Sequence, residues 1–156
     1  MDDRAPIALE LSLGANPHLV SPVRCFLEQA LKSVVTDADF VDRVAMAAHE
    51  LLENATKYSA DDAVLKLSLV LDGATGRDVV LRVSNVAQAA HLQRLRRFLA
   101  EINEAADPMI LYLDMMARDP FDTTVSGLGL ARIRAEAAMF LDLMVENEMV
   151  TLTART

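Results

Sequence analysis

The chain has 156 residues, of which 53% are hydrophobic, and a formal net charge of −8. This length favours a single domain that spans residues 1–156, and the hydrophobic content excludes a disordered chain. Because an acidic chain repels phosphate backbones, we expect no nucleic-acid partner.

The first third of the chain predicts one strand and two helices. Alternating apolar residues indicate a strand from Pro6 to Leu13. A helix is predicted from His18 to Val35, with Pro22 in its first turn, where the missing N–H does little harm. Cys25 has apolar neighbours in this helix and is expected to be a buried thiol. A second helix with one apolar stripe ends near Tyr58.

The remainder predicts two strand pairs separated by helices. Strands from Val64 to Leu71 and from Asp78 to Asn85 form a hairpin, with Gly73 and Gly76 in its turn. Further elements are helices over 87–106 and 109–118, a loop over 119–126, a helix over 127–138, and strands over 140–145 and 149–154. Arg94, Arg96 and Arg97 lie outside the stripe of their helix and are interpreted as a solvated face. The order β-α-α-β-β-α-α-α-β-β predicts a two-layer α/β sandwich.

The second helix carries a polar face made of Glu50, Asn54 and Lys57. Their i, i+4, i+7 spacing places them within about 60° of one another. A carboxylate can orient or deprotonate a hydroxyl, an amide oxygen suits Mg²⁺, and an ammonium can meet phosphate charge. The set therefore fits phosphoryl transfer, although an ordinary solvated helix face explains the spacing as well. His49-Glu50 does not extend to a zinc-protease motif, because position 53 is Glu.

A second motif, Gly127-Leu128-Gly129-Leu130, opens the helix that precedes the last strand pair. Glycines before a helix N-terminus let backbone N–H groups approach a phosphate, which the helix dipole favours. The alternative is a tight loop in which the glycines supply positive φ.

In this order and spacing, the two motifs resemble the GHKL (histidine-kinase-like, HATPase_c) ATPase domain, which histidine kinases share with anti-sigma-factor serine kinases. The resemblance covers roughly residues 39–154. It implies the Bergerat fold, an α/β (α+β) two-layer sandwich whose mixed, mainly antiparallel sheet is covered on one face by helices. It also implies Mg-ATP as the cofactor.

The resemblance further implies a role for each matching residue. Glu50 matches the general base, Asn54 the Mg²⁺ ligand and Lys57 a phosphate contact. Gly127 and Gly129 match the second glycine box, beside the triphosphate.

The first glycine box of that family is altered. Family members end the middle strand with Asp-x-Gly-x-Gly, whose Asp binds the adenine amino group. This chain has Asn85, Ala87 and Ala89 at those positions. Asn85 can still accept a hydrogen bond, without charge. Because Ala disfavours positive φ, a helix from Ala87 is expected in place of the loop.

These features together resemble SiaB-like regulators of bacterial partner-switching circuits. The leading hypothesis is a regulator that binds a STAS-type anti-sigma antagonist, a response regulator or a sigma factor, and that has an altered ATP site. One alternative is an active serine/threonine protein kinase, since Glu50 and Asn54 both remain and phosphoryl transfer depends mainly on positioning. Another is an interaction module without ATP.

A histidine autokinase is the least favoured hypothesis, because neither His18 nor His91 lies in an acceptor pattern. The helices near Arg94 and Met115 offer surfaces for a homodimer. No stretch has the leader or membrane-span pattern, so we expect a cytoplasmic protein with no membrane contact.

Overall fold

The computed structural model describes residues 6–72, 77–118 and 127–156. Within these ranges the predicted order of elements is confirmed. The elements are β1 (Ile7–Gly14), α1 (Pro17–Lys32), α2 (Ala38–Tyr58), β2 (Val64–Leu71), β3 (Val79–Val86), α3 (Ala89–Glu104), α4 (Pro108–Arg118), α5 (Leu128–Glu136), β4 (Phe140–Glu146) and β5 (Met149–Arg155). The turn predicted at Gly73 and Gly76 and the loop predicted over 119–126 lie outside the described residues.

The strands form one five-stranded sheet in the order β1-β2-β3-β5-β4. Every pairing among the described strands is antiparallel, so the expectation of a mixed sheet is wrong. The pairs β2–β3 and β4–β5 are neighbours in sequence, where a short connection suffices for antiparallel pairing. The longer connection from β3 brings the chain back so that β5, and not β4, pairs with β3.

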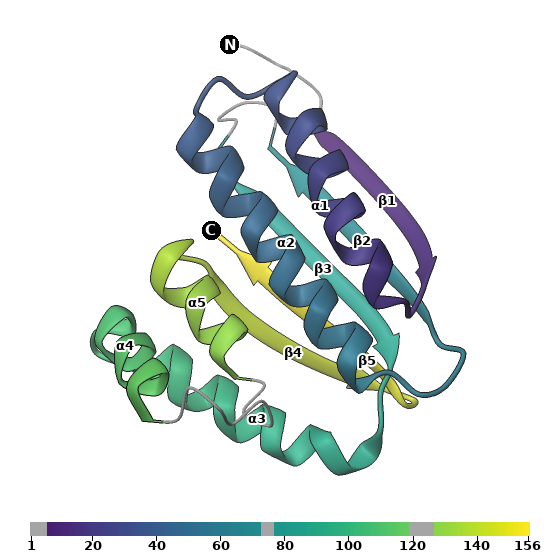
Figure 1. Ribbon diagram of the computed structural model, residues 1–156, viewed down its shortest axis with the longest axis vertical. Helices are drawn as coiled ribbons and strands as arrows, with labels where there is room; N and C mark the ends of the chain where they lie inside the picture. Colours follow the sequence, from purple (N-terminus) through teal and green to yellow (C-terminus); the bar gives the residue numbers. More distant parts are fainter. Residues whose placement is uncertain (1–5, 73–76, 119–126) are drawn as a thin grey trace.

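One face of the sheet is buried under helices, as the two-layer prediction requires. On β2 the four leucines at odd positions are at most 2% exposed. The intervening residues, such as Lys66, are partly or fully exposed, which is the alternation of a sheet with one solvated face. Figure 1 shows α1, α2 and α5 lying over one side of the sheet and running roughly along its strands. The chain is therefore an α+β protein.

The long helix α2 lies over the centre of the sheet and carries the polar motif. Asp37 caps it by accepting a hydrogen bond from the Phe40 amide at 3.0 Å. The apolar stripe predicted for this helix is confirmed, since all six of its residues are buried: Val41, Val44, Ala45, Ala48, Leu52 and Ala55. α2 packs against α1 on one side and against α5 on the other, above β2 and β3. Its polar face therefore meets α5.

Two predictions about α1 are wrong. Asn16 caps the helix and Pro17 is its first residue, so Pro22 lies inside the helix and not in its first turn. Cys25 is exposed and not buried. The buried positions of α1 are Val20, Leu27 and Leu31, and Cys25 is about 200° around the helix from Leu27. The position of Cys25 around the helix therefore determines its exposure, and its apolar sequence neighbours do not.

The end of β3 confirms that no glycine loop is required there. Ala87 forms an extended bridge with Ser59, and the Gln88 amide donates to the Tyr58 carbonyl at 3.2 Å. Neither Ala87 nor Ala89 has a positive φ. The helix begins at Ala89, two residues later than expected. α3 packs against β4 and α5, while α4 lies outside α5. No helix in the described part of the chain is long and apolar enough to cross a membrane.

Candidate functional site

Four of the predicted site residues line one cavity between α2, α4 and α5, called the polar cavity below. Its volume is about 350 Å³, within the range of about 300–1,000 Å³ typical of ligand sites. α2 contributes Glu50, Asn54 and Lys57, and α5 contributes Gly129. The other lining residues are Glu53, Tyr58, Tyr112, Leu128, Leu130 and Arg132. The two sequence motifs are therefore adjacent in space.

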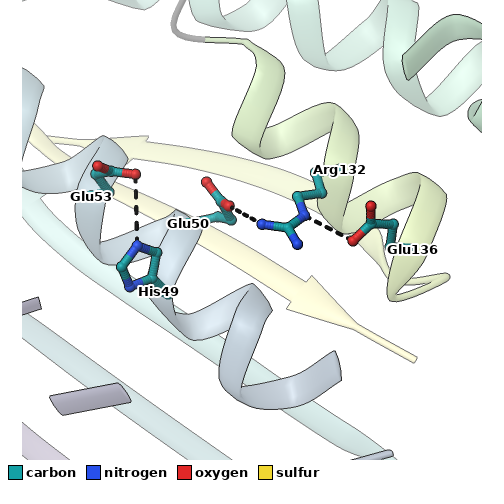
Figure 2. A network of polar contacts seen from close by, with 5 residues as sticks. All are labelled: His49, Glu50, Glu53, Arg132 and Glu136. Carbon is teal, nitrogen blue, oxygen red and sulfur yellow. Dashed lines mark hydrogen bonds and ion pairs between the residues drawn. The ribbon is translucent and has the colours of Figure 1, made fainter. Parts of the chain in front are cut away.

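Within this cavity Glu50 is held by an arginine that the sequence motifs did not identify. Glu50 Oε1 accepts a hydrogen bond from Arg132 at 3.2 Å, and the Arg132 Nε donates to Glu136 at 2.8 Å. Figure 2 shows this chain of contacts between α2 and α5. Glu50 is 13% exposed and Arg132 is 40% exposed. The hydrogen bond that Arg132 donates to Glu136 is the largest cause that raises the pKa of Arg132, so the guanidinium remains charged.

Gly129 allows α5 to approach Glu50 closely. A Cβ at position 129 would lie 2.2 Å from Glu50 Oε2. Gly129 belongs to the first turn of α5 and does not have positive φ. Gly129 therefore leaves room for the Glu50 carboxylate in its present position. It leaves Glu50 with one oxygen on Arg132 and the other against the helix backbone.

Gly127 is also explained by close packing. It precedes α5 with φ −82° and ψ −15°, an ordinary helical conformation. A Cβ there would lie 1.9 Å from Cζ of Phe98 on α3. The alternative interpretation, a loop that needs positive φ, is wrong for both glycines. Gly127 lines a different cavity from Gly129.

This second cavity, the apolar cavity, lies between α2, α3 and the sheet, and its volume is about 110 Å³. Asn54, Tyr58 and Leu130 border both cavities, which makes them neighbours. The remaining lining residues are Ala55, Asn85, Ala87, His91, Leu92, Arg94, Leu95, Phe98, Gly127, Val150 and Leu152. The rings of His91 and Tyr58 are in contact, with centroids 4.7 Å apart. Side chains of α3 therefore occupy much of this space.

Asn85 is buried at the end of β3, with 4% of its surface exposed. Its Nδ2 donates to Ser59 Oγ at 3.0 Å and lies 3.4 Å from the Ala55 carbonyl oxygen. These bonds join β3 to the last turn of α2. With Nδ2 used in this way, Oδ1 is the atom of Asn85 that can accept a bond from a ligand in the apolar cavity.

Tyr112 of α4 closes the outer side of the polar cavity. It is 9% exposed. Burial, followed by the negative charge of Glu136, raises the pKa of its hydroxyl. Tyr112 therefore remains a neutral hydrogen-bonding group beside two carboxylates and a guanidinium.

The polar cavity also contains oxygen atoms that could contribute to a cation site. Among the described residues, no group of three or more His, Cys, Asp or Glu side chains could bind a metal ion. His49 lies 3.9 Å from Glu53 and faces away from the Glu50–Arg132 contact (Figure 2). Asn54 and the neighbouring Glu53 could supply the one or two protein oxygens that Mg²⁺ uses beside phosphate.

The sequence motifs did not indicate Arg132, Tyr112 or Phe98. Only Arg132 has a signal, because it follows Gly129 by three residues and must share a face of α5 with it. Tyr112 and Phe98 reach the cavities from α4 and α3, and their approach depends on tertiary packing.

Comparison with known proteins gives no assignment: no family model matches the sequence, and no curated protein is significantly similar to it.

Proposed function

We propose that this chain is a bacterial regulatory protein with a modified Bergerat fold that acts by binding a partner protein in a partner-switching circuit. Its ATP site would retain the phosphate end and be restricted at the adenine end. The observation that carries the proposal is the convergence of Glu50, Asn54, Lys57 and Gly129 on the polar cavity. The partner would be a STAS-type antagonist, a response regulator or a sigma factor.

Two cationic side chains, Lys57 and Arg132, line the polar cavity beside the carboxylates of Glu50 and Glu53, which supports the proposed magnesium triphosphate site. Lys57 and the exposed N–H groups of Arg132 would meet the phosphate oxygens while Arg132 keeps its bond to Glu50, and Asn54 would hold Mg²⁺. When bound, Mg²⁺ would neutralise part of the triphosphate charge. The N-terminus of α5, with Gly129 in its first turn, adds a favourable dipole.

The arrangement of Glu50 favours a binding protein over an active kinase. A general base needs an oxygen within hydrogen-bonding reach of the hydroxyl that it deprotonates. One oxygen of Glu50 accepts from Arg132, and the other lies against Gly129. Phosphoryl transfer would therefore require Arg132 to leave Glu50 first.

An active serine/threonine kinase is the second candidate, and Arg132 is the observation that favours it. A triphosphate would compete with Glu50 for the guanidinium, and this exchange would release a Glu50 oxygen toward the hydroxyl of a partner. The Glu136 bond would keep the base of the arginine in place. In the third candidate, an interaction module without ATP, Asn54 would be neutral to substitution.

Calorimetric titration with Mg-ATP distinguishes these functions. We expect weak binding by the wild type, no binding by Asn54→Ala, and wild-type binding by Gln29→Ala, a matched amide exposed on α1. Equal binding by all three proteins would refute the site. Wild type that gives no heat up to about 1 mM Mg-ATP would leave only the interaction module without ATP. A Kd of about 1 mM corresponds to a binding free energy of about −4.1 kcal/mol.

A second experiment separates the binding protein from the kinase. Labelled ATP is incubated with the chain and a candidate STAS-type partner. The regulator predicts a complex without phosphate transfer. Transfer that Glu50→Gln abolishes, while complex formation persists, would establish the kinase instead.

A further inference from the structure

The apolar cavity contains one polar atom that the fold leaves without a partner. Asn85 is 4% exposed and lines the cavity from the end of β3. Its Nδ2 donates to Ser59 Oγ at 3.0 Å, and it lies 3.4 Å from the Ala55 carbonyl oxygen and 3.5 Å from that of Val86. In the described part of the chain, no group donates a hydrogen bond to Oδ1. Because a buried acceptor without a donor is unfavourable, a ligand that supplies the donor would be stabilised here.

The neighbours of Asn85 fix the orientation of its amide. Ser59 Oγ donates its only proton to the Ala55 carbonyl oxygen at 2.6 Å, so it can only accept from Asn85. The carbonyl oxygens of Ala55 and Val86 can also only accept. All three groups therefore require Nδ2 on their side of the amide. Oδ1 lies on the other side, toward the cavity that Asn85 lines.

The size and the walls of the apolar cavity limit what can meet this oxygen. Its volume of about 110 Å³ is below the roughly 150 Å³ of a cavity that holds benzene, so one six-membered ring is the upper limit. Much of the wall is apolar, and its largest apolar side chains are Leu92, Leu95, Phe98, Leu130, Val150 and Leu152. A purine has two rings, and such walls would leave several of its ring nitrogens without donors. The cavity therefore favours a smaller and less polar molecule than adenine.

We propose that the apolar cavity binds a small one-ring molecule that is apolar except for a single O–H or N–H donor, as in a phenol. The donor would bond to Asn85 Oδ1, and the ring would pack against Phe98 and the aliphatic walls. The walls would select for the ring, and Oδ1 would select for the donor. This inference does not rest on Mg-ATP binding, because the polar cavity takes no part in it.

Calorimetric titration of the whole chain with phenol and with fluorobenzene tests the hydrogen bond without changing the protein. Fluorine is close in size to a hydroxyl group but donates no hydrogen bond. We expect phenol to bind with a Kd of about 1 mM or lower, and fluorobenzene at least about threefold more weakly. A cavity without an acceptor would give the reverse order, because phenol loses its hydrogen bonds to water on entering it. Equal or tighter binding of fluorobenzene, or no binding of phenol up to about 10 mM, would overturn the proposal.

NMR chemical shifts locate the bound phenol. The side-chain amide signals of Asn85 are expected to move during the titration, whereas those of Gln29, which is exposed on α1, should not. Binding that leaves the Asn85 signals unchanged would assign phenol to another site and contradict the proposal.

A substitution that fills the cavity provides the matched test on the protein. Ala87 follows Asn85 by two residues in extended backbone, so it lies on the same face and also lines the cavity. Ala87→Leu should weaken phenol binding at least about tenfold, whereas Ala100→Leu, on the exposed side of α3, should not change it. Circular dichroism verifies that both variants fold. A folded Ala87→Leu variant with wild-type affinity would refute the site, and the two ligands decide alone if the variant does not fold.

Discussion

The polar cavity and the apolar cavity share the wall formed by Asn54, Tyr58 and Leu130, yet they differ in size and in the side chains that fill them. On the polar side, charged side chains surround about 350 Å³. On the apolar side, Phe98 and its neighbours from α3 leave about 110 Å³. The comparison teaches that side chains from one helix, α3, can fill the space on one side of a shared wall while the other side keeps a larger, charged cavity.

The largest expected effect comes from placing an Asp at the end of β3, where the GHKL ATPases that this sequence resembles carry one. Asn85→Asp removes the Nδ2 donor to Ser59 and places a carboxylate near the Ala55 carbonyl, so we expect a loss of about 3 kcal/mol at neutral pH. Burial would raise the folded-state pKa of the new carboxyl above its unfolded value of about 3.9. Stability is therefore closest to wild type below about pH 4 and falls as pH rises. Urea unfolding at both pH values measures this, and a pH-independent loss would contradict it.

Gly127→Ala is expected to destabilise the fold by about 2 kcal/mol, because the added Cβ would overlap the Phe98 ring. Gly129→Ala should cost less, since the obstructing atom is at the flexible end of Glu50. Chemical denaturation compares the two variants. If α3 did not pack against Gly127, Gly127→Ala would instead stabilise the helix start by up to about 1 kcal/mol.

Phe98→Ala tests whether α3 restricts the adenine end. Removing the ring enlarges the apolar cavity, so we expect Mg-ATP affinity to rise about tenfold, or 1.4 kcal/mol, at some loss of stability. Phe26→Ala, on α1, serves as the control. Calorimetry that finds unchanged or weaker binding by Phe98→Ala would contradict a restriction by this ring.

The smallest effect concerns Tyr112 on the polar side. Its pKa is raised in the folded state above the ordinary value of 10.0, chiefly by burial. The hydroxyl therefore contributes stability below about pH 10 that is lost as pH rises through its folded pKa. Tyr112→Phe should reduce the fall in Tm between about pH 9 and pH 11. Parallel Tm curves for variant and wild type would show that Tyr112 does not titrate in this environment.

Much of the fold was predictable because its signals are local. The alternation of β2 and the stripe of α2 are confirmed by burial, since a period of two or 3.6 residues fixes which side chains meet the core. The pairing of β3 with β5 was not predictable. It joins residues about 70 positions apart, such as Val83 and Leu152, and several strand orders would satisfy the alternation of both segments. The prediction that Cys25 is buried is wrong because the position of a residue around the helix, and not its sequence neighbours, decides its burial.

In the candidate site, too, the grouping within one helix was predictable and the contacts between helices were not. Glu50, Asn54 and Lys57 share one helix, so their grouping follows from spacing alone. That they face Gly129 depends on the packing of α5 against α2. Arg132 lies on α5 and Phe98 on α3, and tertiary packing brings both helices to the cavities. Sequence periodicity does not specify which cavity each side chain lines.

The central claim is a phosphate end that binds beside a restricted adenine end. It is tested most directly by measuring the binding of each part of the nucleotide separately. Calorimetry would compare magnesium triphosphate, adenosine and Mg-ATP as ligands of the wild-type protein. The account predicts that magnesium triphosphate binds within about threefold of Mg-ATP, which is under 1 kcal/mol, and that adenosine gives no heat. Adenosine binding, or Mg-ATP binding more than about tenfold tighter than magnesium triphosphate, would show that the adenine end is open and would contradict the account.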